Sequence, residues 1–399
     1  MRIAIIIKST TFHKNHGGME VQNRILAEGL AERGNQVVVY SPKAEMQFMN
    51  KIDHKVLYRF VDSPYKNNNI LQSIFNINVK GTWYNKSFHE FKKDHDASPY
   101  DVVISQSSAG LGIIRKKEEL KIKVISIAHG TMMSDFKTLL NRPKTIISLL
   151  KIAKDYEYAI RTMLTRQKEF ILKSDIVVAV SKHVKKNVIL ETGVEPENVQ
   201  VIYNGVKEPE LNLNLRNTYP APILYVGRVE EDKGLFELIR LFNKVTETTK
   251  YDLKLAIVGE GTATQRLKDL AESLKCQDKV VFAGYLNGDA LLEYYAKARI
   301  FVLPTKRIEG FPVTLPEAMF AGLPIVAMDM GGVREGVFDS ETGYLINAGD
   351  FETFEKKVEL LVKDADLRQT LGENSRKKAR SLFSEAKMID SYLELIVRL

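Results

Sequence analysis

Two glutamates eight positions apart bound the segment of this 399-residue chain that holds the most candidate ligand-binding residues. The segment EGFPVTLPE runs from Glu309 to Glu317, and its Thr314 and Pro316 suit the cap and the first turn of a helix. Glu317 would then lie in that first turn, where a carboxylate can accept hydrogen bonds from two vicinal hydroxyls such as those of ribose. Glu309 would reach other hydroxyls of the same ligand. The alternative is that both acids only complement the helix dipole.

Around this helix start the sequence supplies groups that bind anions. The backbone N–H groups of Val313, Thr314 and Leu315 would have no partner within the helix, and a helix N-terminus favours a phosphate. The segment GRVEEDKG adds Arg228 as a planar fork and Lys233 as a point charge. Carboxylates beside a phosphate-binding turn indicate a nucleotide diphosphate that carries a sugar. The alternative is that the two cations are solvated loop charges.

The first half of the chain offers comparable loops. Gly17 and Gly18 follow the first apolar run and open a helix, where backbone N–H groups can approach a phosphate closely. His129 ends another apolar run, which would place an imidazole at the end of a strand. A plain turn and a structural histidine are the alternatives. Gly331 and Gly332 indicate a turn that enters a helix rather than a ligand contact.

Short apolar runs must position these residues. They are mostly continuous rather than alternating, which is typical of strands buried on both faces of a parallel sheet. The first series covers Arg2–Lys8, Gln36–Ser41, Asp101–Gln106, Lys123–Gly130, Asp175–Ser181 and Val199–Gly205, and the second covers Ile223–Arg228, Lys254–Gly259, Val280–Gly284, Ile300–Pro304 and Pro324–Asp329. Two such series predict two doubly wound α/β domains, with ligands beyond the carboxyl ends of the strands, in the cleft between the domains.

Three segments outside these runs have an expected place. A proline-containing linker over Lys207–Pro222 would join the two domains. The segment Ser384–Leu399 predicts an amphipathic helix that closes the second domain or crosses back to the first. A longer amphipathic segment, Lys137–Lys173, is rich in basic residues. Its apolar face would pack on the sheet, or the segment would lie on an anionic membrane.

Composition excludes several classes of protein. With 44% hydrophobic and 27% charged residues, the chain is neither wholly disordered nor fibrous. No apolar run approaches the ~18 residues of a membrane-spanning helix. The single cysteine, Cys276, cannot form an intrachain disulfide, so a cytoplasmic location is expected. Residues 1–205 carry 31 Lys and Arg against 20 Asp and Glu, a surplus that suits an anionic partner or only keeps the protein soluble.

Together these features resemble the retaining glycosyltransferases of family 4, which have the GT-B fold of two facing Rossmann-like domains. The strongest marker is the Glu-x7-Glu pattern within EGFPVTLPEAMFAGLPIVA. Supporting segments are GRVEEDKG at 227–234, the glycine loop at 17–18, SIAHG at 126–130, VIYNGV at 201–206 and IVGEG at 257–261. The resemblance implies an acceptor-side domain over 1–206 plus 384–399 and a nucleotide-sugar-binding domain over 207–383.

The resemblance also implies which residues act. Those implied in catalysis are His129, Glu309, Arg228 and Lys233. Those implied in donor binding are Gly17, Gly18, Arg228, Lys233, Leu286, Glu309, Phe311, Val313, Thr314 and Glu317. Pro312 stands where the family often has glycine, and it has no N–H to offer.

Each of these residues has an implied role. The cations would neutralise the departing diphosphate, Glu317 would bind the ribose, and Glu309 would bind the hydroxyls of the donor sugar. Backbone amides around Phe311 would hold the sugar and the β-phosphate, and the glycine loop would face the phosphates. The base would lie near Leu286, and His129 would stand beside the sugar.

The implied reaction moves a sugar from a UDP- or GDP-sugar to a hydroxyl acceptor with retention of anomeric configuration. Stabilisation of the charge on the leaving diphosphate would be the main catalytic effect. The leaving phosphate oxygen would take the proton of the acceptor. No metal and no further cofactor is expected, because fixed cations do this work. The pairs Asp94–Asp96, Asp364–Asp366 and His13–His16 fit surface charges better than a metal site.

Other functions remain open at this point. A nicotinamide-dependent oxidoreductase would explain Gly259 and Gly261 after a strand, but Thr264 stands where the third glycine of that fingerprint belongs. A sugar-nucleotide epimerase and a non-enzymatic nucleotide-sugar binder are further alternatives. The expected acceptor is a lipid-linked or surface-glycan precursor, with peripheral contact to the inner face of the cell membrane. The alternative is a small soluble acceptor. No nucleic acid partner is expected.

Overall fold

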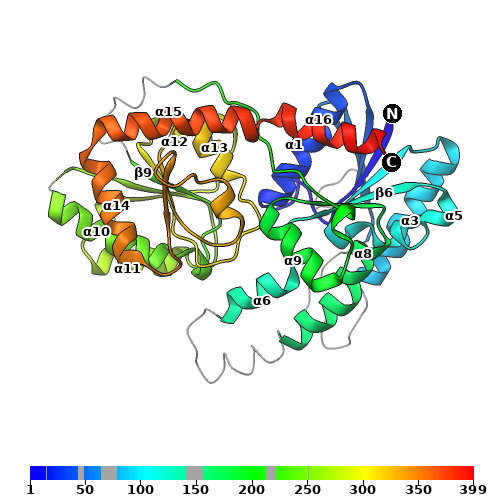
Figure 1. Ribbon diagram of the computed structural model, residues 1–399, viewed down its shortest axis with the longest axis horizontal. Coiled ribbons are helices and arrows are strands. Elements are labelled where there is room, and N and C mark those ends of the chain that lie inside the picture. Colours follow the sequence, from blue (N-terminus) through cyan, green and yellow to red (C-terminus); the bar gives the residue numbers. More distant parts are fainter. Residues whose placement is uncertain (15, 44–48, 64–78, 141–155, 213–221, 250) are drawn as a thin grey trace. The chain divides into compact units, whose positions relative to one another are not determined.

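The computed structural model describes residues 1–399 except 15, 44–48, 64–78, 141–155, 213–221 and 250 (Figure 1). The chain divides into two compact units. The first unit comprises Met1–Phe136, Leu149–Gly205 and Glu385–Leu399, and the second comprises Lys137–Ser148 and Val206–Ser384. The C-terminal segment therefore groups with the N-terminal part of the chain, which decides between the two places expected for it.

The first unit is built on a sheet with the strand order β3-β4-β2-β1-β5-β6-β7-β8. Its strands are β1 (Arg2–Ile6), β2 (Gln36–Pro42), β3 (Asn50–Asp53), β4 (Val56–Val61), β5 (Val102–Gln106), β6 (Lys123–Ala128), β7 (Ile176–Ala179) and β8 (Val199–Val201). Neighbouring strands run parallel except β3 and β4, which are antiparallel. Central strand β1 is almost wholly buried, as its continuous apolar sequence predicts.

Helices accompany this sheet along the chain. They are α1 (Gly18–Glu32), α3 (Val79–Ala97), η1 (Ser107–Gly110), α4 (Leu111–Ile114), α5 (Lys117–Leu120), α6 (Met132–Leu140), the π-turn η2 (Met163–Gln167), α8 (Lys168–Lys173), α9 (Lys182–Thr192), η3 (Pro196–Asn198) and α16 (Glu385–Val397). From Lys137 onward α6 groups with the second unit. Helices α1 and α16 pack together so closely that a Cβ on Gly29 would lie 2.6 Å from Ile389 (Figure 1).

The second unit has a wholly parallel sheet with the order β11-β10-β9-β12-β13-β14. Its strands are β9 (Ile223–Val226), β10 (Leu255–Val258), β11 (Val280–Gly284), β12 (Ile300–Leu303), β13 (Ile325–Met328) and β14 (Gly343–Ile346). Its helices are η5 (Glu231–Lys233), α10 (Leu235–Thr249), α11 (Thr264–Ser273), η6 (Gln277–Lys279), α12 (Gly288–Lys297), α13 (Thr314–Phe320), η7 (Gly332–Glu335), α14 (Phe351–Lys363) and α15 (Ala365–Leu382).

Both sheets reverse their strand order at one point, between β1 and β5 in the first unit and between β9 and β12 in the second. Such a switch point is where open α/β sheets bind ligands, beyond the carboxyl ends of the strands. In the second unit, GRVEEDKG begins at the end of β9 and the Glu309–Glu317 segment follows β12. The sheet order therefore brings the two segments to one edge.

Every predicted strand is present, but three strands escaped prediction. Strands β3 and β4 form an antiparallel pair at the edge of the first sheet, and β14 ends the second. Strand β3 is polar, β14 has only four residues, and Arg59 interrupts the apolar residues of β4. The predicted helical segment 137–173 and linker 207–222 lie partly outside the described residues. Where the structure describes the chain, no helix is long and apolar enough to cross a membrane.

Candidate active site

The loop after β9 packs closely against the residues that follow β12. Gly234 has φ +69°, and a Cβ there would lie 2.0 Å from the carbonyl oxygen of Pro304, so only glycine permits this approach. The N–H of Lys306 donates to the carbonyl of Asp232 at 2.9 Å. These two contacts bring Lys233 to the segment that follows β12.

Lys233 and Glu309 form a buried ion pair. Their Nζ and Oε1 atoms are 2.6 Å apart, and the hydroxyl of Thr305 donates to the same carboxylate oxygen at 2.9 Å. Burial by itself would raise the pKa of Glu309, but Lys233, Arg307 and Thr305 together outweigh it and lower the pKa below its ordinary value. Glu309 is therefore a carboxylate at neutral pH, with a cation already beside it.

The backbone of Glu309 is held by two hydrogen bonds to the turn after β13. The N–H of Gly332 donates to the Glu309 carbonyl at 2.8 Å, and the Glu309 N–H donates to the carbonyl of Met330 at 3.3 Å. Gly331 has φ +71°, and a Cβ there would lie 2.4 Å from the Glu309 carbonyl oxygen. The predicted turn thus enters the short helix η7, and its glycines also position a candidate site residue.

Helix α13 begins differently from the prediction. It starts at Thr314 with Val313 as its N-cap and no side-chain cap, so the expected capping role of Thr314 is wrong. The N–H of Leu315 donates to the carbonyl of Pro312 at 3.1 Å and is not available to an anion, which corrects a second expectation. No described residue accepts a hydrogen bond from the N–H of Val313 or Thr314. Those two amides remain as anion donors.

Glu317 lies in the first turn of α13 in an environment unlike that of Glu309. Its Oε2 accepts a hydrogen bond of 2.8 Å from the hydroxyl of Tyr295 on α12, a side chain only 1% exposed. Burial raises the pKa of Glu317 to about 7, although the bond from Tyr295 lowers it. No described cation pairs with this carboxyl. Its charge therefore changes near neutral pH.

Three other predicted residues of the second unit lie at or near strand ends. Arg228 is exposed directly after β9, and its carbonyl accepts a hydrogen bond of 2.8 Å from the buried hydroxyl of Tyr225. Leu286 is half-buried just beyond β11. The ring of Phe311 is buried, 5.1 Å from that of Phe383, so this residue can offer a ligand its backbone but not its side chain.

In the first unit, the glycine loop at 17–18 is hydrogen-bonded to a carboxylate on α1. The N–H of Gly17 donates to Oε2 of Glu20 at 2.9 Å, and the hydroxyl of Ser9 donates to the other carboxylate oxygen. Gly18 is exposed at the start of α1. The Gly17 N–H is therefore already bonded, and Gly18 is the residue of the pair that a ligand could approach.

His129 ends a hydrogen-bond chain that runs through buried amide side chains. Its Nε2 lies 2.6 Å from Oε1 of Gln106, and Nε2 of Gln106 donates to Gln22 at 3.2 Å and to Asn23 at 3.0 Å. Because Gln106 presents its oxygen, the imidazole must donate from Nε2 and keeps a lone pair on Nδ1. Burial and the charge of Lys8 lower the pKa of His129 to about 3. His129 is neutral, with one tautomer fixed.

Several site residues were missed from the sequence. Thr305 and Gln106 stand at or just after the carboxyl ends of β12 and β5, so a search of all polar residues at strand ends would have found them. Gly331 was seen but not connected to Glu309. Tyr295 lies inside α12 with no local pattern that sets it apart. Its link to Glu317 depends on how the two helices pack.

One group of potential metal ligands lies among the described residues. Oxygen and nitrogen atoms of Glu28, Asp53 and His54 come within 4.8 Å of one another. Arg24 already supplies a cation there, with Nε 2.7 Å from Glu28 and a terminal nitrogen 3.6 Å from Asp53. The group is therefore already engaged in ion pairs that join α1 to the β3–β4 turn.

The second unit thus gathers a buried cation, two amide donors and two carboxyl groups at one sheet edge. Lys233 and the amides of Val313 and Thr314 can face phosphate oxygens, and the two glutamates can face hydroxyls. Gly17, Gly18 and His129 belong to the other unit. A buried cation and oriented amides in one place are suited to stabilise charge on a leaving diphosphate.

Comparisons with known proteins agree with this chemistry. Residues 16–208 match the family model described as Glycosyltransferase Family 4, and residues 207–378 match the one described as Glycosyl transferases group 1. The chain is 26% identical to the uncharacterized glycosyltransferase MJ1607 of Methanocaldococcus jannaschii over 92% of this chain and 91% of the relative. It is 27% identical to the capsular polysaccharide biosynthesis glycosyltransferase CapM of Staphylococcus aureus over 59% and 64% of the respective chains.

Among solved structures, HepE of Anabaena in complex with UDP and glucose aligns over the whole of both chains. The TM-score is 0.73 at 16% sequence identity, so the two proteins share a fold.

Proposed function

The chain belongs to the group 1 and family 4 glycosyltransferases of the GT-B fold, and from this premise we propose that it transfers a sugar from a UDP- or GDP-sugar to a hydroxyl acceptor with retention of anomeric configuration. The observation that carries the proposal is the buried pair of Lys233 and Glu309 in the segment before α13, a helix whose start has no side-chain cap. This arrangement supplies a cation, amide donors and a carboxylate within one loop system.

In the proposed complex, the diphosphate takes hydrogen bonds from Lys233, Arg228 and the two amides of α13. Glu317 accepts hydrogen bonds from the ribose hydroxyls, and the base lies by Leu286. As a phosphate oxygen approaches Lys233, the Nζ group turns partly from Glu309 to the phosphate. The carboxylate of Glu309 then has oxygen lone pairs for the hydroxyls of the donor sugar.

The proposed chemical step uses charge stabilisation rather than a covalent enzyme intermediate. The bond between the anomeric carbon and the phosphate oxygen breaks, and the acceptor oxygen attacks from the same face. The leaving phosphate oxygen takes the acceptor proton. Lys233 and Arg228 stabilise the charge that grows on the diphosphate. His129 contacts the donor sugar, and its fixed lone pair on Nδ1 accepts a hydrogen bond from a sugar hydroxyl.

The proposed acceptor is a lipid-linked or surface-glycan precursor. CapM, with which the chain aligns over 59% of its length, is named for capsular polysaccharide biosynthesis. The basic surplus of residues 1–205 would suit an acceptor with a diphosphate or an anionic membrane surface. A small soluble acceptor would make that surplus irrelevant to catalysis, and activity would then be insensitive to anionic vesicles.

A thermal-shift panel of UDP-glucose, UDP-N-acetylglucosamine and GDP-mannose tests donor binding, because a bound donor raises the melting temperature. Glu317→Ala should weaken binding of the best donor at least about tenfold, the loss of charged hydrogen bonds to a diol. Glu293→Ala, an exposed glutamate on α12, is the matched control and should leave affinity unchanged. NMR of the product fixes the anomeric configuration, and an inverted product would refute the proposed mechanism.

A further inference from the structure

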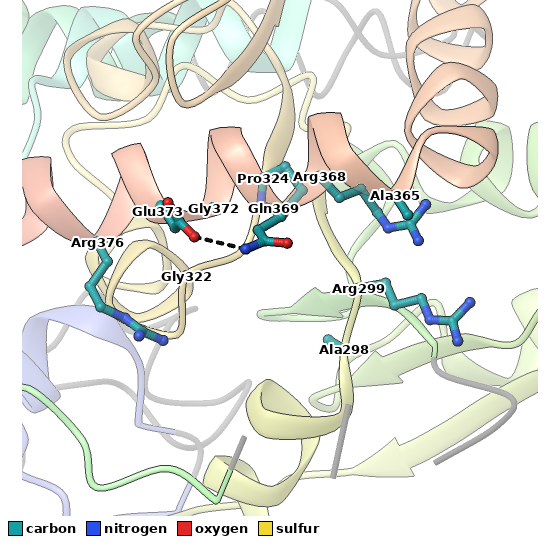
Figure 2. Close-up of a pocket in the computed structure, with 10 residues that line it drawn as sticks. All are labelled: Ala298, Arg299, Gly322, Pro324, Ala365, Arg368, Gln369, Gly372, Glu373 and Arg376. Atoms are coloured by element: carbon teal, nitrogen blue, oxygen red, sulfur yellow. Dashed lines mark hydrogen bonds between the residues drawn. The ribbon is translucent and has the colours of Figure 1, made fainter. Parts of the chain in front are cut away.

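The second unit contains a hollow of about 450 Å³ at the edge of its sheet opposite the candidate active site (Figure 2). Arg299 and Pro324, which line it, stand directly before β12 and β13, so the hollow lies at the amino ends of these strands. The Glu309–Glu317 segment follows the carboxyl end of β12. Helix α15 supplies most of the other lining residues. We call this feature the arginine hollow, after Arg299, Arg368 and Arg376.

Positive charge predominates in the arginine hollow. Arg368 donates to the carbonyl of Val362 at 2.9 Å and also to that of Leu361. Arg376 donates to the carbonyl of Phe320 at 3.0 Å. These acceptors are uncharged, and within the described part of the chain neither arginine forms an ion pair. The one lining carboxylate, that of Glu373, is exposed and accepts a hydrogen bond of 3.0 Å from Gln369 (Figure 2).

Two of these arginines repel one another. In Figure 2 the side chains of Arg299 and Arg368 run in the same direction from the wall of the hollow. Burial, and next the charge of Arg299, lower the pKa of Arg368, although Asp364 and Tyr251 oppose the shift. Two guanidinium groups that line one hollow give it a positive potential, which favours an anionic ligand.

We propose that the arginine hollow binds a phosphoryl group, carried either by a small phosphorylated molecule or by an anionic lipid headgroup. A guanidinium fork matches the oxygen spacing of phosphate and can bind it bidentately, which an ammonium cannot. The site is separate from the donor diphosphate site and does not depend on the proposed reaction.

The test uses the full chain and three probes: inorganic phosphate, glucose 6-phosphate, and vesicles of phosphatidylglycerol with phosphatidylcholine vesicles as the blank. Calorimetry measures binding of the two free phosphates, and flotation measures binding to vesicles. The variant Arg299→Gln removes one guanidinium without touching the carbonyls held by Arg368 and Arg376. The matched control is Lys377→Gln, which removes one charge from an exposed position on α15. Melting temperatures without ligand confirm that each variant is folded.

Arg299→Gln should weaken binding of at least one probe about tenfold, and Lys377→Gln should not. Lys233→Ala identifies binding in the donor site, because it should leave binding in the arginine hollow intact. Binding to glucose 6-phosphate or phosphate assigns the site to a small molecule, and binding only to phosphatidylglycerol vesicles assigns it to a headgroup. The proposal is overturned if no probe binds, if Arg299→Gln binds like the wild type, or if Lys233→Ala alone abolishes binding.

Discussion

Replacement of Tyr295 by Phe should change how donor affinity depends on pH. The Tyr295 hydroxyl touches only the carboxylate of Glu317 among the described side chains, at 2.8 Å, so the variant removes one hydrogen bond and leaves the ring in place. A hydrogen bond to a charged group contributes about 1.5–3 kcal/mol, which corresponds to about 1–2 units of pKa. Burial already raises the pKa of Glu317 to about 7, and the variant should raise it further.

The size of the effect follows from the ionised fraction of Glu317. At pH 7 about half of the wild-type carboxyl is charged, but only about 1–10% of the variant carboxyl would be. Because an ionised carboxylate accepts hydrogen bonds from ribose hydroxyls more strongly than the neutral acid does, the donor KM at pH 7 should rise by up to about 5- to 50-fold. At pH 9 the two proteins should agree within about twofold, since at least about half of the carboxyl is ionised in both. The value of kcat at saturating donor should change little.

Steady-state kinetics between pH 5.5 and 9 measure this directly. Tyr294→Phe, which alters the preceding residue of α12, is the matched control and should follow the wild type. If the donor KM of Tyr295→Phe follows the wild-type pH profile, or is raised equally at every pH, Tyr295 serves packing alone and the reasoning fails.

Three further variants test the electrostatics of the site. Glu317→Gln should be about 3 kcal/mol more stable than the wild type at pH 8 and within about 1 kcal/mol at pH 5. The reason is that the pKa of Glu317 is about 7 in the folded state and 4.5 in the unfolded state, so the wild type loses stability as the pH rises from about 4.5 to about 7. Equal urea midpoints of the two proteins at pH 8 would contradict this. Lys233→Met should lower the free energy of unfolding by about 3 kcal/mol because it leaves the buried Glu309 without its hydrogen-bonded cation, with only the charge of Arg307 remaining. The double variant with Glu309→Gln should recover stability in urea but not kcat, and a double variant as unstable as the single one argues against the coupling. Gln106→Glu should place a carboxylate beside Nε2 of His129, raise its pKa from about 3, and add a step between pH 5 and 8 to kcat/KM. An imidazole NMR titration checks the assignment, and an unchanged pKa would show that Gln106 does not control this histidine.

The sequence predicts the strands of both sheets because their burial leaves a continuous apolar run. It also predicts that Lys233 and Glu309 serve one ligand site, since each lies after a strand and strand ends of a parallel sheet share one edge. Their direct ion pair was not predicted. Strand β3 escapes such reasoning because a partly exposed edge strand needs no continuous apolar sequence. Strand β4 is mostly buried, but Arg59 interrupts its apolar residues.

Contacts that depend on how two helices pack cannot be predicted from residue patterns along the sequence. Tyr295 lies in the middle of α12, where an aromatic residue predicts only a core position, and its hydroxyl could have faced many neighbours. The bond of Leu315 to Pro312 was missed for a related reason. The sequence indicates that a helix starts near Thr314, but a tight turn just before that start decides which amides remain exposed.

The two glutamates show why a motif alone does not assign roles. Glu309 is buried beside Lys233, which holds its pKa low, whereas Glu317 is buried without a cation and its pKa rises to about 7. A carboxylate that is always ionised suits contact with a sugar while the leaving group gains charge next to it. A carboxyl that titrates near neutral pH instead makes affinity for the ribose adjustable. In the proposed reaction, environments that push the pKa values of the two acids apart would therefore assign donor chemistry to Glu309 and donor affinity to Glu317.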